Sequence, residues 1–182
     1  MADSGSGASM RPIDRFVEQF QRRDLRAHYL RENRIHPRDL DGWAYPSEEQ
    51  VREAEKAIGK SLPPSYKHLV RNFHPGELPF DFYWIGGVGT CWVDGIEVRL
   101  MDLVEIAGPA TSFLIPLMSV GDCDEVCFDT RRADADGEYP LVHWDAAIHG
   151  SDPHPGVEFE VWAGNLGELL LGQIDRLPHV GA

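Results

Sequence analysis

The chain has 182 residues, with 17 Lys or Arg against 30 Asp or Glu, so its formal net charge is −13. This length predicts one domain with a short extension, large enough to fold without disulfides or metals. The acidic balance disfavours a nucleic-acid binder, three cysteines fit a reducing compartment, and the apolar runs are too short to cross a membrane. We therefore expect a cytoplasmic protein that contacts neither nucleic acid nor membrane directly.

Two N-terminal segments precede the expected main domain, residues 43–182. Residues 1–10 are small and polar, lack the apolar core of a secretion signal, and are expected to form a disordered tail. Apolar side chains at helical spacing predict one amphipathic helix over 12–33, within an arginine-rich extension over 11–42. Its arginines are interpreted first as solvated or docked on the acidic domain. A contact with a partner or nucleic acid comes second, and a membrane-surface helix is least favoured.

The main domain is expected to begin with two short helices. Ser47 and Gln50 have the spacing of a capping box, and Gly59 suits a helix end, so a helix is predicted over 47–58. A third helix is predicted to start within residues 62–64, because proline is tolerated in a first turn. Both helices have an apolar stripe at a spacing that would face a common core.

A change of pattern after residue 78 predicts strands followed by one more helix. Turn signals such as Asp94-Gly95 separate the hydrophobic runs and favour a hairpin there. Asn165 and Glu168 have the spacing of a second cap, for a last helix over 164–177. A short helix or turn is predicted over 101–107, and strands over 80–84, 91–93, 96–98, 114–120, 125–129, 139–144 and 157–162. This order predicts an α+β fold with N-terminal helices, an antiparallel meander sheet and a closing C-terminal helix.

The negative charge is concentrated between residues 121 and 160. This stretch holds eleven acidic and two basic residues, a net charge of −9. On charge alone, solubility explains the excess better than binding does, since many cytosolic proteins are acidic. The alternative is a surface built for a basic partner.

A run of His and Asp from His143 to His154 is the strongest enzyme-like pattern. Imidazole and carboxylate groups can bind a divalent metal that activates water. The spacing matches no tight metal motif, and prolines in the run indicate an irregular loop, so structural or exposed positions are favoured. Cys123 and Cys127 are interpreted as buried small side chains. The aromatic residues at 83, 84, 92, 144 and 162 are expected in the core.

Several segments, in order along the chain, resemble the SUKH superfamily. The first is the capped acidic helix that begins at Ser47, with Gly59, Leu62-Pro63 and Tyr66-Lys67 after it. The others are Ile115-Pro116-Leu117, Gly121-Asp122, Val126-Cys127-Phe128-Asp129, Pro140-Leu141-Val142-His143-Trp144-Asp145 and Asn165-Leu166-Gly167-Glu168-Leu169-Leu170. The resemblance covers about residues 43–177 and leaves the arginine-rich helix outside.

The resemblance implies an α+β fold without catalysis, and we expect no cofactor and no metal. Many bacterial members are similar to immunity proteins that neutralise a secreted toxin, often a nuclease, whereas other members are regulatory interaction modules. The matched positions look structural. Partner choice is therefore expected in the departures, which are the N-terminal helix and the acidic loops over 134–138 and 146–156.

We therefore predict a non-enzymatic immunity protein that occludes the basic active site of a cognate toxin, with a nuclease as the expected target. Long-range attraction would speed association, and a few desolvated contacts would set the lifetime of the complex. The alternatives are a regulatory interaction module and, less favoured, a metal-dependent hydrolase that uses the His143–His154 cluster. The predicted contacts are Asp122, Asp124, Glu125, Asp134, Asp136, Glu138, Asp145 and Asp152.

Overall fold

The computed structural model describes residues 10–32, 36–41, 45–73, 78, 113–120, 124–150 and 154–176. The helices are α1 (Pro12–Arg22), α2 (Leu25–Glu32), α3 (Glu48–Ile58), α4 (Pro64–Asn72), α6 (Ala146–His149) and α7 (Leu166–Ile174), with 3-10 turns at η1 (Pro37–Leu40) and η4 (Thr130–Arg132). The strands are β1 (Leu114–Ser119), β2 (Asp124–Asp129), β3 (Leu141–Asp145) and β4 (Glu160–Ala163). The tail over 1–9 and the strands and turn predicted between 80 and 107 lie outside the described residues.

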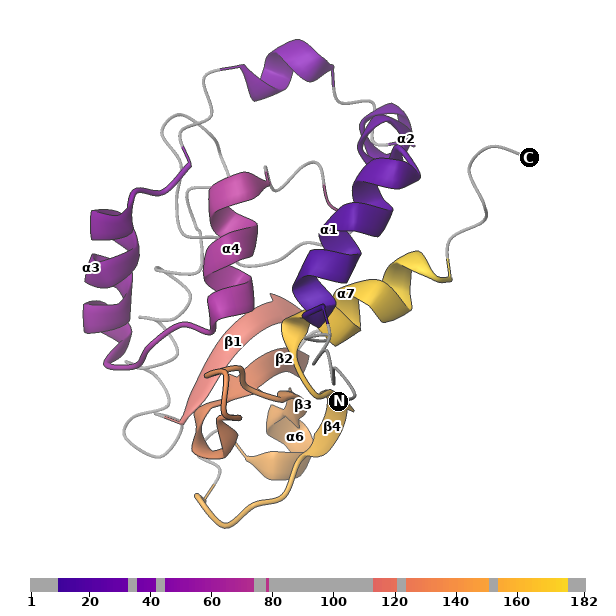
Figure 1. The fold of residues 1–182 in the computed structure, drawn as a ribbon. Helices are drawn as coiled ribbons and strands as arrows, with labels where there is room; N and C mark the ends of the chain where they lie inside the picture. The colour runs from indigo at the N-terminus through magenta and orange to yellow at the C-terminus, as the bar shows by residue number, and fades with distance from the viewer. Residues whose placement is uncertain are drawn as a thin grey trace, which may run out of the picture.

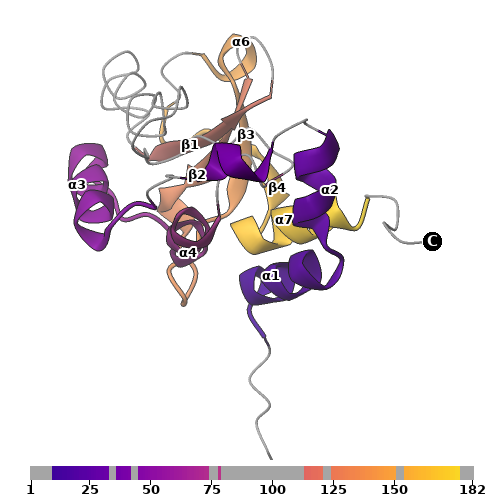
Figure 2. The same ribbon diagram turned by 90° about the horizontal axis from the view of Figure 1, so that it is seen from above.

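The four described strands form an antiparallel meander in the order β1-β2-β3-β4, which confirms the predicted α+β class. Helices α4 and α7 lie along one face of this sheet, and α1 packs against α7 (Figure 1, Figure 2). Because side chains alternate along a strand, Val126 and Phe128 of β2 face these helices, while Cys127 faces the opposite side. Both faces of β2 are therefore buried, each in its own hydrophobic cluster.

The cluster on the helix side joins segments that are far apart in the sequence. Phe16 and Phe20 of α1 both contact Phe73, with ring centroids 6.0 and 5.5 Å apart. Tyr66 of α4 meets Phe128 of β2 edge to face, with 6.0 Å between the ring centroids. All five side chains are buried, so α1 contributes to the same core as the sheet. Within the described ranges, no helix has the length and apolarity needed to cross a membrane.

The predicted helix caps are confirmed by their hydrogen bonds. The N–H of Gln50 donates to Ser47 Oγ, and the N–H of Ser47 donates to Gln50 Oε1, which is the reciprocal pair of a capping box. Gly59 ends α3 with a left-handed backbone, φ 71°. At the start of α7, the N–H of Glu168 donates to Asn165 Oδ1 at 3.0 Å.

The predicted single helix over 12–33 is wrong, because the structure has two helices that are separated at Arg23 and Asp24. Asp24 adopts a left-handed backbone with φ 49°, which interrupts the helix. In one continuous helix, Leu25 would lie about 140° around the axis from Phe20. The break redirects the chain, so both of these side chains are buried in the core.

Two further features near β3 and β4 differ from the prediction. Helix α6 is a single turn inside a segment that was predicted as an acidic loop, and Asp145 caps it by accepting from the N–H of Ala147 at 2.7 Å. Trp162 on β4 is 40% exposed, so its predicted place in the core is wrong. The buried positions predicted for Trp144 and Cys127 are confirmed.

Candidate functional site

The predicted acidic contacts fall into two groups at opposite ends of β2. Asp124 begins β2 and lies directly across from Asp145 of β3 in the strand register. The other group lies in the connection that follows β2 and η4, and a strand of this length spans roughly 17–20 Å. Asp122 and Asp152 lie outside the described residues. We call the acids of the connection the loop group, which consists of Asp134, Asp136 and Glu138.

Two of the three loop-group acids accept hydrogen bonds from backbone N–H groups of the same chain. The Glu138 carboxylate accepts hydrogen bonds from the N–H of Ser65 at 2.8 Å and from the Ser65 hydroxyl, and so caps the start of α4. Asp134 Oδ1 accepts from the N–H groups of Asp136 and Glu138 at 2.8 and 2.9 Å. Asp134 and Glu138 are therefore engaged within the protein, although Asp134, like Asp136, is exposed at the surface and Glu138 is half-buried.

Glu138 is expected to lower the stability of the fold as the pH rises above about 4. Burial raises the pKa of Glu138, and the hydrogen bonds from Ser65 act in the opposite direction. A carboxyl group with a raised pKa in the folded state stabilises the fold most below its unfolded pKa, and this contribution is lost as the pH rises through the folded pKa. Between about pH 4 and pH 7, Glu138→Gln should therefore lose less free energy of unfolding than the wild type. Urea denaturation across this range checks the prediction, and parallel pH profiles would contradict it.

Glu125 is a buried acid at the start of β2. Glu125 is 7% exposed and pairs in register with Trp144 of β3. Trp144 belongs to the hydrophobic cluster on the sheet face away from α4 and α7, so Glu125 is directed to the same side. Glu125 is therefore the least accessible of the described acids in the predicted contact set.

The other group of acids lies beside a pair of stacked rings that the charge pattern did not indicate, in which Trp162 is exposed and His143 is half-buried. The ring of Trp162 stacks on the ring of His143, with 5.4 Å between centroids and 24° between planes. His143 Nε2 lies 3.8 Å from Asp124 Oδ2, and the register places Glu160 across from His143. We call this surface the strand-end site, which consists of Asp124, His143, Asp145, Glu160 and Trp162.

Two histidines of the run from His143 to His154 contact backbone atoms that are close to them in the sequence. His149 Nδ1 lies 3.0 Å from both the backbone nitrogen and the carbonyl oxygen of Asp145. His154 Nδ1 accepts a hydrogen bond from the N–H of Gly156 at 3.0 Å. Across the part of the chain that the structure describes, no group of three or more His, Cys, Asp or Glu side chains is placed to hold a metal ion.

A family model now places this architecture among known proteins. The model of the SMI1/KNR4 family (SUKH-1) matches residues 45–171. The chain belongs to the SMI1/KNR4 family. The match runs from just before α3 into α7 and includes all four described strands, which confirms the resemblance. Members of this SUKH-1 family are commonly immunity proteins and are generally non-catalytic. A comparison with curated proteins finds no significant match.

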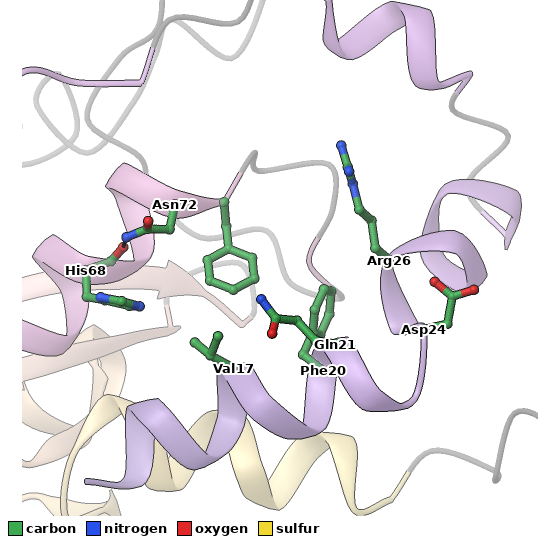
Figure 3. Close-up of a pocket in the computed structure, with 8 residues that line it drawn as sticks. Val17, Phe20, Gln21, Asp24, Arg26, His68 and Asn72 are labelled. Carbon is green, nitrogen blue, oxygen red and sulfur yellow. Dashed lines mark hydrogen bonds between the residues drawn. The ribbon is translucent and has the colours of Figure 1, made fainter.

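The SUKH-1 match leaves α1 outside, although α1 forms one wall of a groove on the domain. The groove has a volume of about 470 Å³ and lies between α1 and α4. Figure 3 shows Val17 and Gln21 on the α1 side, with His68 and Asn72 on the α4 side. Its lining mixes apolar and polar side chains, and Asn72 Nδ2 donates to the carbonyl oxygen of His68 at 2.7 Å. The groove therefore depends on a helix that the SUKH-1 domain itself does not supply.

Proposed function

We propose that this protein is an immunity protein that binds a cognate toxin in the cytoplasm and blocks its active site without chemistry of its own. The observation that carries the proposal is the SUKH-1 match over residues 45–171, because members of this family are commonly immunity proteins. The net charge of −13 supports a basic partner, and a nuclease-type toxin is basic where it holds nucleic acid. The proposed partner is therefore a basic nuclease domain.

Blocking requires fast association and a long-lived complex. Negative charge over residues 121–160 would attract a basic toxin at long range and speed the encounter, by an amount that falls with ionic strength. A few desolvated aromatic or charged contacts would then set the lifetime of the complex. Asp124, Asp136 and Asp145 are the described acids proposed to take part, together with Asp122 and Asp152 of the same acidic stretch.

Co-expression with the product of the adjacent gene tests the proposed function. The neighbour alone should arrest growth, and this protein should restore growth and co-purify with the neighbour as a stable complex. The association rate should fall roughly tenfold or more between low and physiological salt, because electrostatic steering is screened. A harmless neighbour, or rescue without a complex, would overturn the proposal. A stable complex with a housekeeping protein would then favour the regulatory alternative.

A further inference from the structure

We propose that the strand-end site is the surface on which the partner docks, and that the partner places an arginine-bearing basic surface against Trp162. This inference rests on the proposed function and adds the location of the interface and the chemistry of its occupant. The central feature is an exposed tryptophan held in a defined orientation on a sheet face. The acidic side chains around it determine the charge of the surface that fits there.

A β-bulge gives Trp162 its orientation. Leu141 pairs with Ala163, yet the next residue of β3, Val142, pairs with Val161, so Trp162 is an additional residue in β4. In a regular ladder Trp162 would pair with Val142 and face the buried cluster on the far side of the sheet. The bulge instead brings the indole onto the ring of His143, on the opposite face. Bulges commonly redirect a side chain in this way at edges and functional sites.

The surroundings of Trp162 carry negative charge. Asp124 and Asp145 face each other directly across β2 and β3, and Glu160 lies across from His143. The side chain of Asp124 is 36% exposed and that of Glu160 is exposed. Strands β2, β3 and β4 contain no Lys or Arg. Like charges directly opposite on a sheet are destabilising, and a cationic side chain placed between them would relieve the repulsion.

An arginine from the partner satisfies both features of this surface. A guanidinium can stack on an indole face by a cation–π contact, and it can also donate hydrogen bonds to neighbouring carboxylates. Exposed tryptophan is among the side chains that most often dominate binding at protein interfaces. Both groups contain acids that accept hydrogen bonds within the chain, Asp145 in one and Asp134 and Glu138 in the other, but only the strand-end site holds an exposed tryptophan. The structure therefore favours the strand-end site of the two acidic groups.

The docking surface is tested by measuring binding of the purified protein to the toxin encoded by the adjacent gene. Trp162→Ala should weaken binding by roughly 30-fold or more, the loss typical of a hot-spot residue. Val161→Ala is the matched control, because Val161 is 45% exposed on the same strand but pairs with Val142 and faces the other side. This control should change the affinity by less than about threefold, as expected of a position outside the interface.

Charge reversal tests the chemistry of the occupant. Asp124→Lys and Glu160→Lys should each slow association by roughly tenfold at low salt, since a rim charge mainly affects the association rate. Glu53→Lys makes the same change of charge at an exposed position on α3, outside the proposed binding surface, and should have a much smaller effect. Thermal unfolding of every variant confirms that it is folded before its binding is interpreted.

The outcomes separate this inference from the proposed function. If the wild type binds the toxin and Trp162→Ala binds equally well, the docking surface is wrong and the immunity function stands. If Val161→Ala weakens binding as much as Trp162→Ala, the partner uses the edge of β4 rather than one face, which overturns the inference. Self-association of the wild type that is lost in Trp162→Ala would identify a second copy as the occupant and also overturn it. If the wild type binds no toxin, both proposals fail.

Discussion

Arg131→Ala is expected to lower the free energy of unfolding by about 3–5 kcal/mol, because it leaves a buried carboxylate without its partner. The side chain of Asp129 is 1% exposed. Its two oxygens accept hydrogen bonds from Arg131 Nε at 2.8 Å and from Arg131 Nη2 at 2.7 Å, which is a bidentate arrangement. Urea denaturation at neutral pH measures the loss.

The same guanidinium also holds the segment that leads into β4, which adds to the expected effect. Arg131 Nη1 donates to the carbonyl oxygens of Pro155 and, at 3.2 Å, of Val157, and Cζ lies 4.2 Å from the centroid of the Phe113 ring. Arg132→Ala is the matched control, because this neighbouring arginine is exposed, and it should change stability by less than about 0.5 kcal/mol. Equal losses in the two variants would show that the buried carboxylate does not depend on Arg131.

Gly167→Ala is expected to destabilise the protein by about 3 kcal/mol, at the upper end of the usual cost of overpacking. A methyl carbon at this position would lie 2.3 Å from the backbone nitrogen of Ile13 and 2.6 Å from the carbonyl carbon of Pro12. Backbone atoms cannot rotate out of the way as a side chain can, so α1 would have to move off α7. Chemical or thermal denaturation measures the loss.

A second glycine in the same helix separates this packing effect from helix propensity. Around Gly172, nothing lies within 4 Å of the position that an added methyl carbon would take. Gly172→Ala should therefore stabilise the protein by about 0.5–1 kcal/mol, the difference in helix propensity between the two residues. If Gly167→Ala were as stable as Gly172→Ala, the close contact between α1 and α7 would be refuted. The comparison thus tests whether α1, which lies outside the SUKH-1 match, is part of the cooperative fold.

Local features were predictable because they depend on residues a few positions apart. Ser47, Gln50 and Gly59 define the ends of α3 through hydrogen bonds and backbone geometry within that one helix. The strands β1, β2 and β3 follow hydrophobic runs between turn residues, and their observed bounds agree with the predicted ranges to within two residues. The family resemblance consists of such local pieces in a fixed order, so it was also visible in the sequence.

The candidate site was predictable only in part, because a count of charges does not distinguish surface carboxylates from those the fold uses. Glu138 accepts from Ser65, 73 positions away, and nothing near Glu138 in the sequence indicates that contact. Trp162 looked like a core residue by its type, and its exposure follows from the bulge in β4. Asp145 did carry a local signal, since aspartate directly ahead of a helical turn is a common N-cap.

The sequence by itself determined the order of helices and strands, the caps that delimit them and the family to which the chain belongs, since each of these depends on short-range patterns. The tertiary structure decided where the N-terminal helix breaks, which acids stay at the surface and which sheet face Trp162 occupies. These features arise from contacts and strand register between distant residues. Neither hydrophobic periodicity nor net charge encodes such contacts.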